Sequence, residues 1–403
     1  MATEPQGPSR PFRILMLAPT PFFSDRGCHV RIHEEAEALR RCGHEVGIVT
    51  YHLGRDAGAG SVWRIPNIPW YTKTSAGPSW HKPYLDVLLF LKAVRVARTW
   101  RPDIIHAHLH EGALLGVLLG RLMRLPVLFD CQGSLTGEIL EHRFVRQGSF
   151  LHKLFNWVET WINRHVDQIA TSSTRTMADM LEVWPELGER IFALPDAVDL
   201  AAFRPVGKDP ALLHELGIPE DRKVLVYLGA LSEPQGTDLM LEVLARLFRE
   251  RRDLHALIMG FPEEKYREKA KALGLEGQVT FTGRIDYAKA CSYLCLGDLA
   301  LSPKLSRTEA NGKLLNYMAC GLPCVVFDTP VNRELLGETG VYAAYGDADA
   351  FAARIVEVVD NPEDRMVLSR QVREYVERHH SWEARVRRLV EGYEDMHAYD
   401  EMT

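Results

Sequence analysis

One polar stretch of the chain carries five residues whose types and spacing could do chemistry: Lys304, Arg307, Glu309, Asn311 and Gly312. An apolar segment at 299–301 precedes them and a helical pattern begins near Lys313, which together predict a strand, a loop and a helix. Unpaired N–H groups and the helix dipole favour negative charge at a helix N-terminus, so this stretch predicts a phosphate site. Asn316, one turn into the helix, is expected to hydrogen-bond hydroxyl groups of the same ligand. The alternative is a solvated loop before an ordinary helix.

A second candidate loop, 25–29, follows a predicted strand at 13–18. In it, Gly27 is expected to let a ligand approach the backbone closely, and Arg26 is expected to meet a phosphate. A plain turn is the alternative for this loop.

Four polar residues gather at and after a predicted strand at 126–130: Asp130, Gln132, Ser134 and Glu138. Such a group is costly to leave in a core without partners, which favours a ligand site at the carboxyl end of the strand. A structural hydrogen-bond network is the alternative.

Three histidines lie along and just after another predicted strand: His106, His108 and His110. Their spacing differs from that of two metal ligands one helical turn apart, so we expect residues that line a cleft rather than a metal site. An aromatic-rich helical segment at 144–165 has two interpretations, a part of the core or a hydrophobic acceptor groove.

The bulk composition excludes several classes of protein. A chain of 403 residues with 46% hydrophobic residues predicts two domains. The formal net charge of -6 argues against a general nucleic-acid binder. Seven cysteines without the paired spacing of a zinc site or a disulfide framework indicate reduced core thiols. With no apolar leader and no membrane-spanning run, we expect a cytoplasmic protein.

The order of predicted elements indicates an α/β fold. Two series of alternating strands and helices of similar size, separated by a polar stretch near 205–222, predict two Rossmann-like domains that face each other across a cleft. We expect a flexible N-terminus at 1–11, a first domain at 12–205 and a second at 206–379. A last helix within about 380–403 is expected to return to the first domain.

Nearly the whole chain resembles the retaining GT-B glycosyltransferases of family 4. The resemblance rests on Gly43-His-Glu-Val, Pro102-Asp-Ile-Ile-His-Ala-His, Pro195-Asp-Ala-Val-Asp with Phe203-Arg-Pro, Gly283-Arg284 and, most specifically, the run from Leu314 to Val326. It implies transfer of a sugar from a nucleotide-diphosphate sugar to a hydroxyl acceptor, with no metal and no other cofactor.

The resemblance also implies roles for particular residues. The residues expected to act in catalysis are Asp130, Gln132, Lys304 and Glu309. The residues expected to bind the donor are Arg26, Gly27, Ser134, Glu138, Gly229, Gln235, Asn311, Gly312, Lys313, Leu314, Leu315 and Asn316.

The chain departs from the family pattern at four places. Asn316 stands where the second of two glutamates is usual, with Thr308 at the first position and Glu309 beside it. Ala230 and Gln235 replace an arginine and a lysine, Gln132 replaces a histidine, and Arg26-Gly27 replaces a pair of glycines. A leaving diphosphate still needs positive charge, so we expect Lys304, Lys313 and Arg26 to supply it.

These features favour an enzyme over a nucleotide-sugar-binding protein that has lost turnover, and a phosphorylase or an epimerase is a third possibility. The expected partners are a nucleotide sugar and a hydroxyl acceptor, without nucleic acid. We expect a long irregular stretch with several aromatic residues at 56–83, followed by a basic helix at 85–100. Together they weakly favour a lipid-linked acceptor and peripheral contact with the inner face of a membrane. A solvated surface helix is the alternative.

Overall fold

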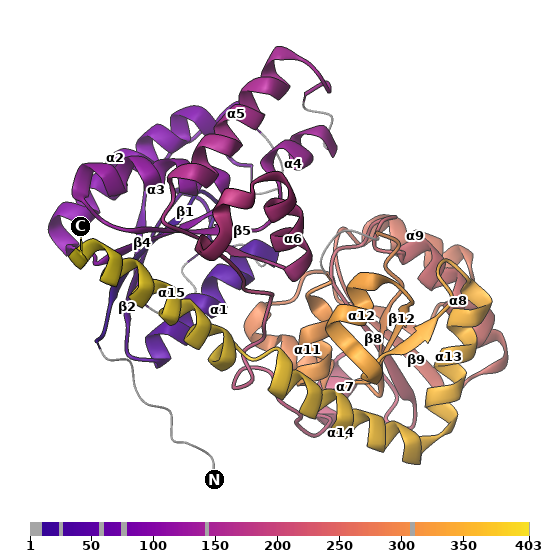
Figure 1. The fold of residues 1–403 in the computed structure, drawn as a ribbon. Helices are drawn as coiled ribbons and strands as arrows, with labels where there is room; N and C mark the ends of the chain where they lie inside the picture. Colours follow the sequence, from indigo (N-terminus) through magenta and orange to yellow (C-terminus); the bar gives the residue numbers. More distant parts are fainter. Residues whose placement is uncertain are drawn as a thin grey trace, which may run out of the picture. The chain divides into compact units, whose positions relative to one another are not determined.

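The computed structural model describes residues 10–23, 27–55, 60–73, 79–141, 145–306 and 311–402. Its internal contacts divide the chain into two compact units, Met1–Asp196 with Trp382–Thr403, and Ala197–Ser381. Each unit holds one parallel sheet with helices packed around it, as Figure 1 shows.

The sheet of the first unit has seven strands in the order β3-β2-β1-β4-β5-β6-β7. These strands are β1 (Arg13–Ala18), β2 (Glu45–Thr50), β3 (Ser61–Arg64), β4 (Ile104–His108), β5 (Val127–Cys131), β6 (Gln168–Thr171) and β7 (Ile191–Ala193). All neighbours are parallel, and Ile14 of β1 stands opposite Ile104 of β4. The central strands are buried along almost their whole length, which explains their nearly unbroken apolar runs.

The helices of the first unit include one from the end of the chain. They are α1 (Gly27–Arg41), α2 (Lys82–Trp100), α3 (Leu109–Met123), α4 (Leu135–Glu141), α5 (Phe150–His165), α6 (Thr174–Val183), the 3-10 helix η1 (Pro185–Arg190) and α15 (Trp382–Met402). Helix α15 packs beside α1, and the indole Nε1 of Trp382 donates to Glu34 Oε2 at 2.8 Å. The predicted return of the last helix to the first domain is therefore confirmed.

The sheet of the second unit has six parallel strands in the order β10-β9-β8-β11-β12-β13. They are β8 (Lys223–Leu228), β9 (Leu254–Met259), β10 (Val279–Phe281), β11 (Leu299–Ser302), β12 (Cys324–Phe327) and β13 (Val341–Ala343). Separate apolar clusters contain alternate residues of β8, Val224 in one and Leu225 in the other, because successive side chains of a strand point to opposite faces of the sheet.

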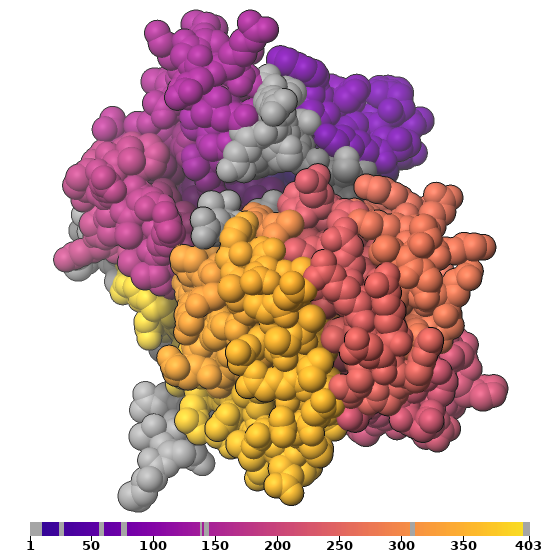
Figure 2. Space-filling view, turned by 90° about the vertical axis from the view of Figure 1, so that its right-hand side faces the viewer, coloured from indigo at the N-terminus to yellow at the C-terminus, as the bar shows by residue number. Residues whose placement is uncertain are grey.

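The helices of the second unit complete this α/β domain. They are α7 (Pro210–Glu215), α8 (Thr237–Glu250), α9 (Glu264–Ala272), η2 (Tyr287–Lys289), α10 (Ala290–Leu294), α11 (Lys313–Ala319), α12 (Pro330–Leu336), η3 (Gly337–Thr339), α13 (Ala348–Asp360) and α14 (Pro362–His379). Helices α8 and α13 pack side by side, and both contribute to the face shown in Figure 2, in red and in yellow-orange.

Both sheets have a point at which the strand order reverses, between β1 and β4 in the first and between β8 and β11 in the second. In open parallel sheets, ligands bind outside the carboxyl ends of the strands at such a point. Gly229 directly follows β8, and Lys304 follows β11 after one residue. Two of the predicted site residues thus lie where this architecture binds ligands.

The α/β prediction with two Rossmann-like domains is confirmed, and three local predictions are corrected. The stretch expected to be irregular at 56–83 contains the edge strand β3, which pairs with β2. The polar stretch near 205–222 contains the short helix α7, whose first turn Asp209 caps through its carboxylate. Helix α1 begins at Gly27, so only the first part of the 25–29 loop precedes it.

Candidate active site

Three predicted donor residues converge at the carboxyl end of β8. Lys313, the first residue of α11, places its ammonium nitrogen Nζ 2.9 Å from Gln235 Oε1 and 3.2 Å from the hydroxyl of Tyr227. The same nitrogen lies 4.4 Å from the centroid of the Tyr227 ring. Gly229 has a φ of 140°, and a Cβ added to it would lie 3.2 Å from Lys313 Nζ. The ammonium group of Lys313, from α11, therefore lies beside the backbone of Gly229, directly after β8.

The loop that leads into α11 is held by buried amide groups. Asn311, only 1% exposed, donates from Nδ2 to Ser302 Oγ at 3.1 Å and to Asn332 Oδ1 at 2.8 Å. Asn332 in turn donates to the carbonyl of Phe327 at 2.8 Å. The side chain of Asn311 thus anchors the loop to the ends of β11 and β12, and the carbonyl of Asn311 accepts from Leu314 N in the first turn.

The segment after β11 is joined to the loop after β8. The backbone N–H groups of Leu305 and Ser306 both donate to the carbonyl of Pro234, at 2.9 and 3.1 Å. Gly236 has a φ of 72°, and a Cβ on it would lie 1.8 Å from the carbonyl oxygen of Pro303. Only glycine allows the backbone at position 236 to approach Pro303 this closely. Lys304, whose side chain is buried, follows Pro303 directly and therefore lies beside the loop after β8.

The remaining predicted residues of α11 differ in their surroundings. Leu314 and Leu315 are buried in the core of the second unit, so a ligand could meet only their backbone. Asn316 is half-buried, and Gly312 precedes the helix without a side-chain cap.

In the first unit, Asp130 is the centre of a buried charge network. Arg31 of α1 donates from Nη2 to Asp130 Oδ1 at 2.8 Å and from Nε to Oδ2 at 3.2 Å, and from Nη1 to Asp196 at 2.8 Å. His108 Nδ1 lies 3.0 Å from Asp130 Oδ2, and Gln132 Nε2 donates to the same oxygen at 2.8 Å. Asp130 is fully buried, so the geometry supports a positioning role for it, with Gln132 as the more accessible partner.

The pKa values of the two buried carboxyl groups in this network, Asp130 and Glu35, shift in opposite directions. Burial alone would raise the pKa of Asp130, but the charge of Arg31 and the hydrogen bond with His108 hold it well below its usual range. Burial and repulsion by Asp130 raise the pKa of Glu35 well above its usual range. We therefore infer that Asp130 is ionised at neutral pH, whereas burial and the charge of Asp130 disfavour the ionised form of Glu35.

Ser134 also has structural partners. Its hydroxyl donates to Glu159 Oε1 of α5 at 2.9 Å, and the backbone N–H groups of Leu135 and Thr136 donate to the same carboxylate at 3.1 and 3.0 Å. Glu159 therefore pairs with the first N–H groups of α4. Burial alone would raise the pKa of Glu159, but hydrogen bonds from His110 and Thr136 lower it to about 2.

The low pKa of Glu159 predicts a loss of stability in acid. Because the folded value lies below the ordinary value of 4.5, the stabilisation is complete above about pH 4.5 and is lost as the pH falls towards 2. From about pH 6 to pH 3, wild type is expected to lose about 2 kcal/mol more unfolding free energy than Glu159→Gln. Urea unfolding at both pH values measures the difference. The exposed Glu391→Gln is the control, and equal losses in Glu159→Gln and wild type would contradict the assignment.

The three histidines are distributed differently from the cleft-lining arrangement that the sequence predicts. His106 and His108 are fully buried on β4, with ring centroids 4.5 Å apart, and His106 Nδ1 lies 2.6 Å from the hydroxyl of Tyr393. Glu35 lies close enough to both histidines to complete a three-ligand group. We assign this group to the buried network, since its members already contact Asp130 and Tyr393.

His110 lines an apolar cavity of about 530 Å³ between α2, α3, α4 and α5. Its wall is mainly aliphatic and aromatic and includes Val87, Leu91, Leu114, Leu118, Ile139 and Phe155. A polar end contains Lys82, Asp86, His110 and Glu111, with Lys82 and Glu111 paired. Phe155 and its neighbours on α5 form one side of this cavity, so the aromatic segment lines apolar space, and its use as an acceptor groove stays a prediction.

Several predicted site residues cannot be placed in this geometry. Arg26 and Glu309 lie outside the described residues. Glu138 belongs to α4, and Gly27 begins α1.

Sequence reasoning missed Arg31, Tyr227, Glu159 and Asn332. Arg31 and Asp130 are 99 positions apart, and nothing in either local pattern indicates the pairing. A lone asparagine such as Asn332 likewise carries no sequence signal for its bond to Asn311.

Comparison with known proteins agrees with the two-domain architecture. A model for the glycosyl transferase 4-like domain matches residues 26–196, and a model for the glycosyl transferases group 1 matches residues 222–361. The chain is 25% identical over 396 residues to phosphatidyl-myo-inositol mannosyltransferase of Mycolicibacterium smegmatis, covering 95% of this chain and 93% of that protein.

Solved structures show the same fold. Sucrose-phosphate synthase from Thermosynechococcus elongatus matches with a TM-score of 0.76 and 18% identity over 96% of this chain and 100% of that chain. HepE from Anabaena, in complex with UDP and glucose, matches with a TM-score of 0.71 and 17% identity over 95% of this chain and 100% of that chain.

Two parallel-sheet Rossmann-like domains with these neighbours define a protein of the GT-B class. The chain belongs to the family 4 glycosyltransferases, as its sequence motifs predict. The subgroup marked by Asn316 stays a prediction. Among the described residues, no helix combines the length and apolar character needed to cross a membrane.

Proposed function

We propose that this protein transfers a sugar, with retained anomeric configuration, from a nucleoside-diphosphate sugar to a hydroxyl group of an amphiphilic acceptor, without a metal ion. The observation that carries the proposal is the position of the Lys313 ammonium beside Gln235 and Gly229. Gln235 stands where the family usually has a lysine. In this chain the ammonium group of Lys313 lies beside Gln235. This position supports our expectation that Lys313 supplies the positive charge that the missing lysine would have provided.

The proposed mechanism gives each residue an electrostatic or positioning task. Lys313, with Lys304 on the neighbouring loop, stabilises the charge that develops on the leaving diphosphate. Gly229 lets the phosphates approach the backbone, and Asn316 hydrogen-bonds ribose hydroxyls. Gln132, held by Asp130, positions the sugar, and a phosphate oxygen of the donor takes the acceptor proton. HepE, with UDP and glucose bound, supports this class of donor.

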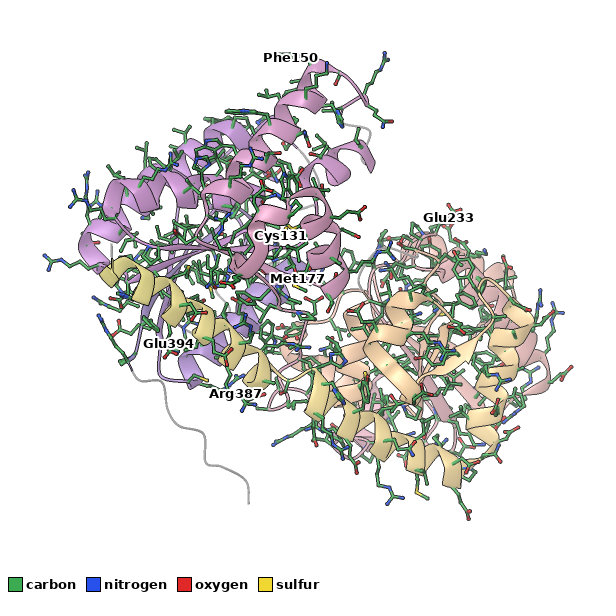
Figure 3. All side chains as sticks on the ribbon, viewed as in Figure 1. Cys131, Phe150, Met177, Glu233, Arg387 and Glu394 are labelled. Atoms are coloured by element: carbon green, nitrogen blue, oxygen red, sulfur yellow. The ribbon has the colours of Figure 1, made fainter. Side chains whose placement is uncertain are left out.

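The apolar cavity of the first unit supports an amphiphilic acceptor. Its volume lies within the range of about 300–1,000 Å³ typical of ligand pockets. Three large apolar side chains on α2 and α5 are exposed: Val87 (58%) and Leu91 (59%), which line the cavity, and Trp157 (62%), which is not part of its lining. Phe150, at the tip of α5 in Figure 3, is 79% exposed. Exposed apolar side chains on helices that line an apolar cavity favour contact with lipids or partners.

The polar end of the cavity suits the hydroxyl-bearing head of such an acceptor. Tyr51 donates to Asp86 Oδ1 at 2.5 Å. Burial raises the pKa of Asp86 to about 7 despite that bond. This end therefore offers both hydrogen-bond donors and acceptors. The name of the mannosyltransferase relative, which specifies a phosphatidyl lipid, agrees with an acceptor of this type.

Activity assays with matched acceptors test the proposal. A thermal-shift screen of nucleotides and nucleotide sugars identifies the donor, because a ligand of the native state raises the melting temperature. Product formation is then measured with acceptors that share one head group and differ in hydrocarbon tail. Binding of the donor without turnover on any acceptor would favour a binding protein, and dependence on inorganic phosphate would indicate a phosphorylase.

A charge placed in the cavity wall is expected to weaken binding of the tailed acceptor selectively. Val87→Asp should raise its KM by about tenfold or more, since burying an unpaired carboxylate against a hydrocarbon chain is costly. The KM for a tail-free acceptor should not change. Val183→Asp is the matched control, because Val183 is similarly exposed (63%) and does not line the cavity. Equal KM values for Val87→Asp and wild type would exclude the cavity as the acceptor site.

A further inference from the structure

Three thiols that are far apart in the sequence meet in the second unit. Cys291 lies on α10, Cys295 is the C-cap of that helix, and Cys320 is the C-cap of α11. Their sulfur atoms all lie within 4.8 Å of one another, and Cys291 Sγ and Cys320 Sγ are 4.0 Å apart. The structure thus forms a triangle of sulfurs that neither the donor site nor the acceptor cavity uses.

The size of this triangle matches a metal–thiolate centre. With metal–sulfur bonds of about 2.3 Å, three sulfurs around one ion lie roughly 4 Å apart. A disulfide requires two sulfurs at about 2.05 Å, which is much shorter than the 4.0 Å between Cys291 and Cys320. The triangle therefore suits an ion better than a covalent bond between these two cysteines.

The surroundings of the sulfurs provide further oxygen and positive charge. The carbonyl of Arg204 lies 3.3 Å from Cys291 Sγ and 3.5 Å from Cys295 Sγ. Arg373 donates from Nη1 to the carbonyls of Phe203 and Ala319, the neighbours in sequence of Arg204 and Cys320. A carbonyl oxygen is thus available as a fourth ligand, and the guanidinium offsets part of the negative charge of three thiolates.

The three sulfur atoms are largely shielded from solvent, but one side of the cluster is accessible to an ion from solution. Cys295 is 7% and Cys320 5% exposed, whereas Cys291 is partly exposed and opens one side to solvent. Buried thiolates exclude hard cations such as magnesium and select soft ions with a filled d shell.

We propose that Cys291, Cys295 and Cys320 bind one thiophilic ion with a filled d shell, zinc(II) or copper(I), as a structural site. The thiols release their protons on binding. The bound ion links α10 to the end of α11, the helix that begins with Lys313. The site stabilises the second unit and takes no part in sugar transfer.

Titration of the reduced, metal-free protein tests the site. Cadmium(II) serves as the spectroscopic probe, because its thiolate complexes absorb in the ultraviolet, and zinc(II) is titrated against a chelating dye. One equivalent of each is expected to bind. Cys291→Ser should weaken zinc binding by about tenfold or more. Cys42→Ser is the matched control, since Cys42 is also partly exposed and lies outside the cluster.

A second measurement on the unaltered chain keeps the test decisive if a serine variant folds poorly. Zinc(II) should protect Cys291 from alkylation, followed by mass spectrometry, and should leave the alkylation of Cys42 unchanged. It should also raise the melting temperature in proportion to the logarithm of its concentration. Undiminished cadmium absorption in Cys291→Ser, or alkylation of Cys291 at the same rate with and without zinc(II), would overturn the proposal.

Discussion

Replacing Lys313 with alanine is expected to lower kcat/KM for sugar transfer by about 100-fold or more. The ammonium group lies beside Gln235 and Gly229 at the carboxyl end of β8, where the proposed diphosphate leaves. Loss of one preorganised group that stabilises charge in a transition state typically costs about 10²–10³ in rate. Steady-state kinetics with saturating acceptor and varied donor measure the effect.

The control for Lys313→Ala is Lys271→Ala, which removes a lysine with a 73% exposed side chain from the same unit. It should leave kcat/KM unchanged.

Lys304→Ala is expected to lower kcat/KM by an order of magnitude or more, because that lysine follows β11 beside the same loop. If Lys313→Ala and Lys304→Ala both retain full turnover, the proposed redistribution of positive charge is incorrect.

Replacing Arg31 with methionine is expected to destabilise the first unit by about 3–5 kcal/mol. The substitution removes the two hydrogen bonds that Arg31 makes to Asp130 and leaves a fully buried carboxylate without its cation. An uncompensated buried charge is among the costliest single changes in a protein core. Urea unfolding followed by a probe in the first unit, such as tryptophan fluorescence, measures the loss.

The pH dependence of Arg31→Met separates this charge effect from a simple loss of packing. In wild type the charge of Arg31 keeps the pKa of Asp130 well below its usual range, against the effect of burial. When Arg31 is absent, burial raises the pKa of Asp130. The stability deficit of the variant should therefore shrink as the pH falls and the unpaired Asp130 carboxylate is protonated.

Arg13→Met is the matched control for this prediction, because the ion pair of Arg13 with Glu45 is exposed, with side-chain accessibilities of 40% and 61%. Exposed pairs contribute only about 0–1 kcal/mol. A deficit for Arg31→Met no larger than that of Arg13→Met would contradict the network.

The sequence by itself determined most of the strands and the α/β class, and it placed the predicted phosphate stretch between a strand and a helix. Apolar runs such as 13–18 and 223–228 predict buried parallel strands because such strands are covered on both faces. The sequence predicts a helix from about Lys313, and α11 begins at that residue. Features of this kind depend on neighbouring residues and on periodicity, which a single chain displays directly.

Only the tertiary structure decided which side chains meet. Arg31 pairs with Asp130, Lys313 reaches Gln235, and Cys291 lies near Cys320, over separations of 99, 78 and 29 positions. The apolar cavity of the first unit likewise needs four helices to enclose it. These contacts depend on strand order and on the packing of helices against the sheets. Local sequence patterns do not encode such contacts, because each partner alone is compatible with many surroundings.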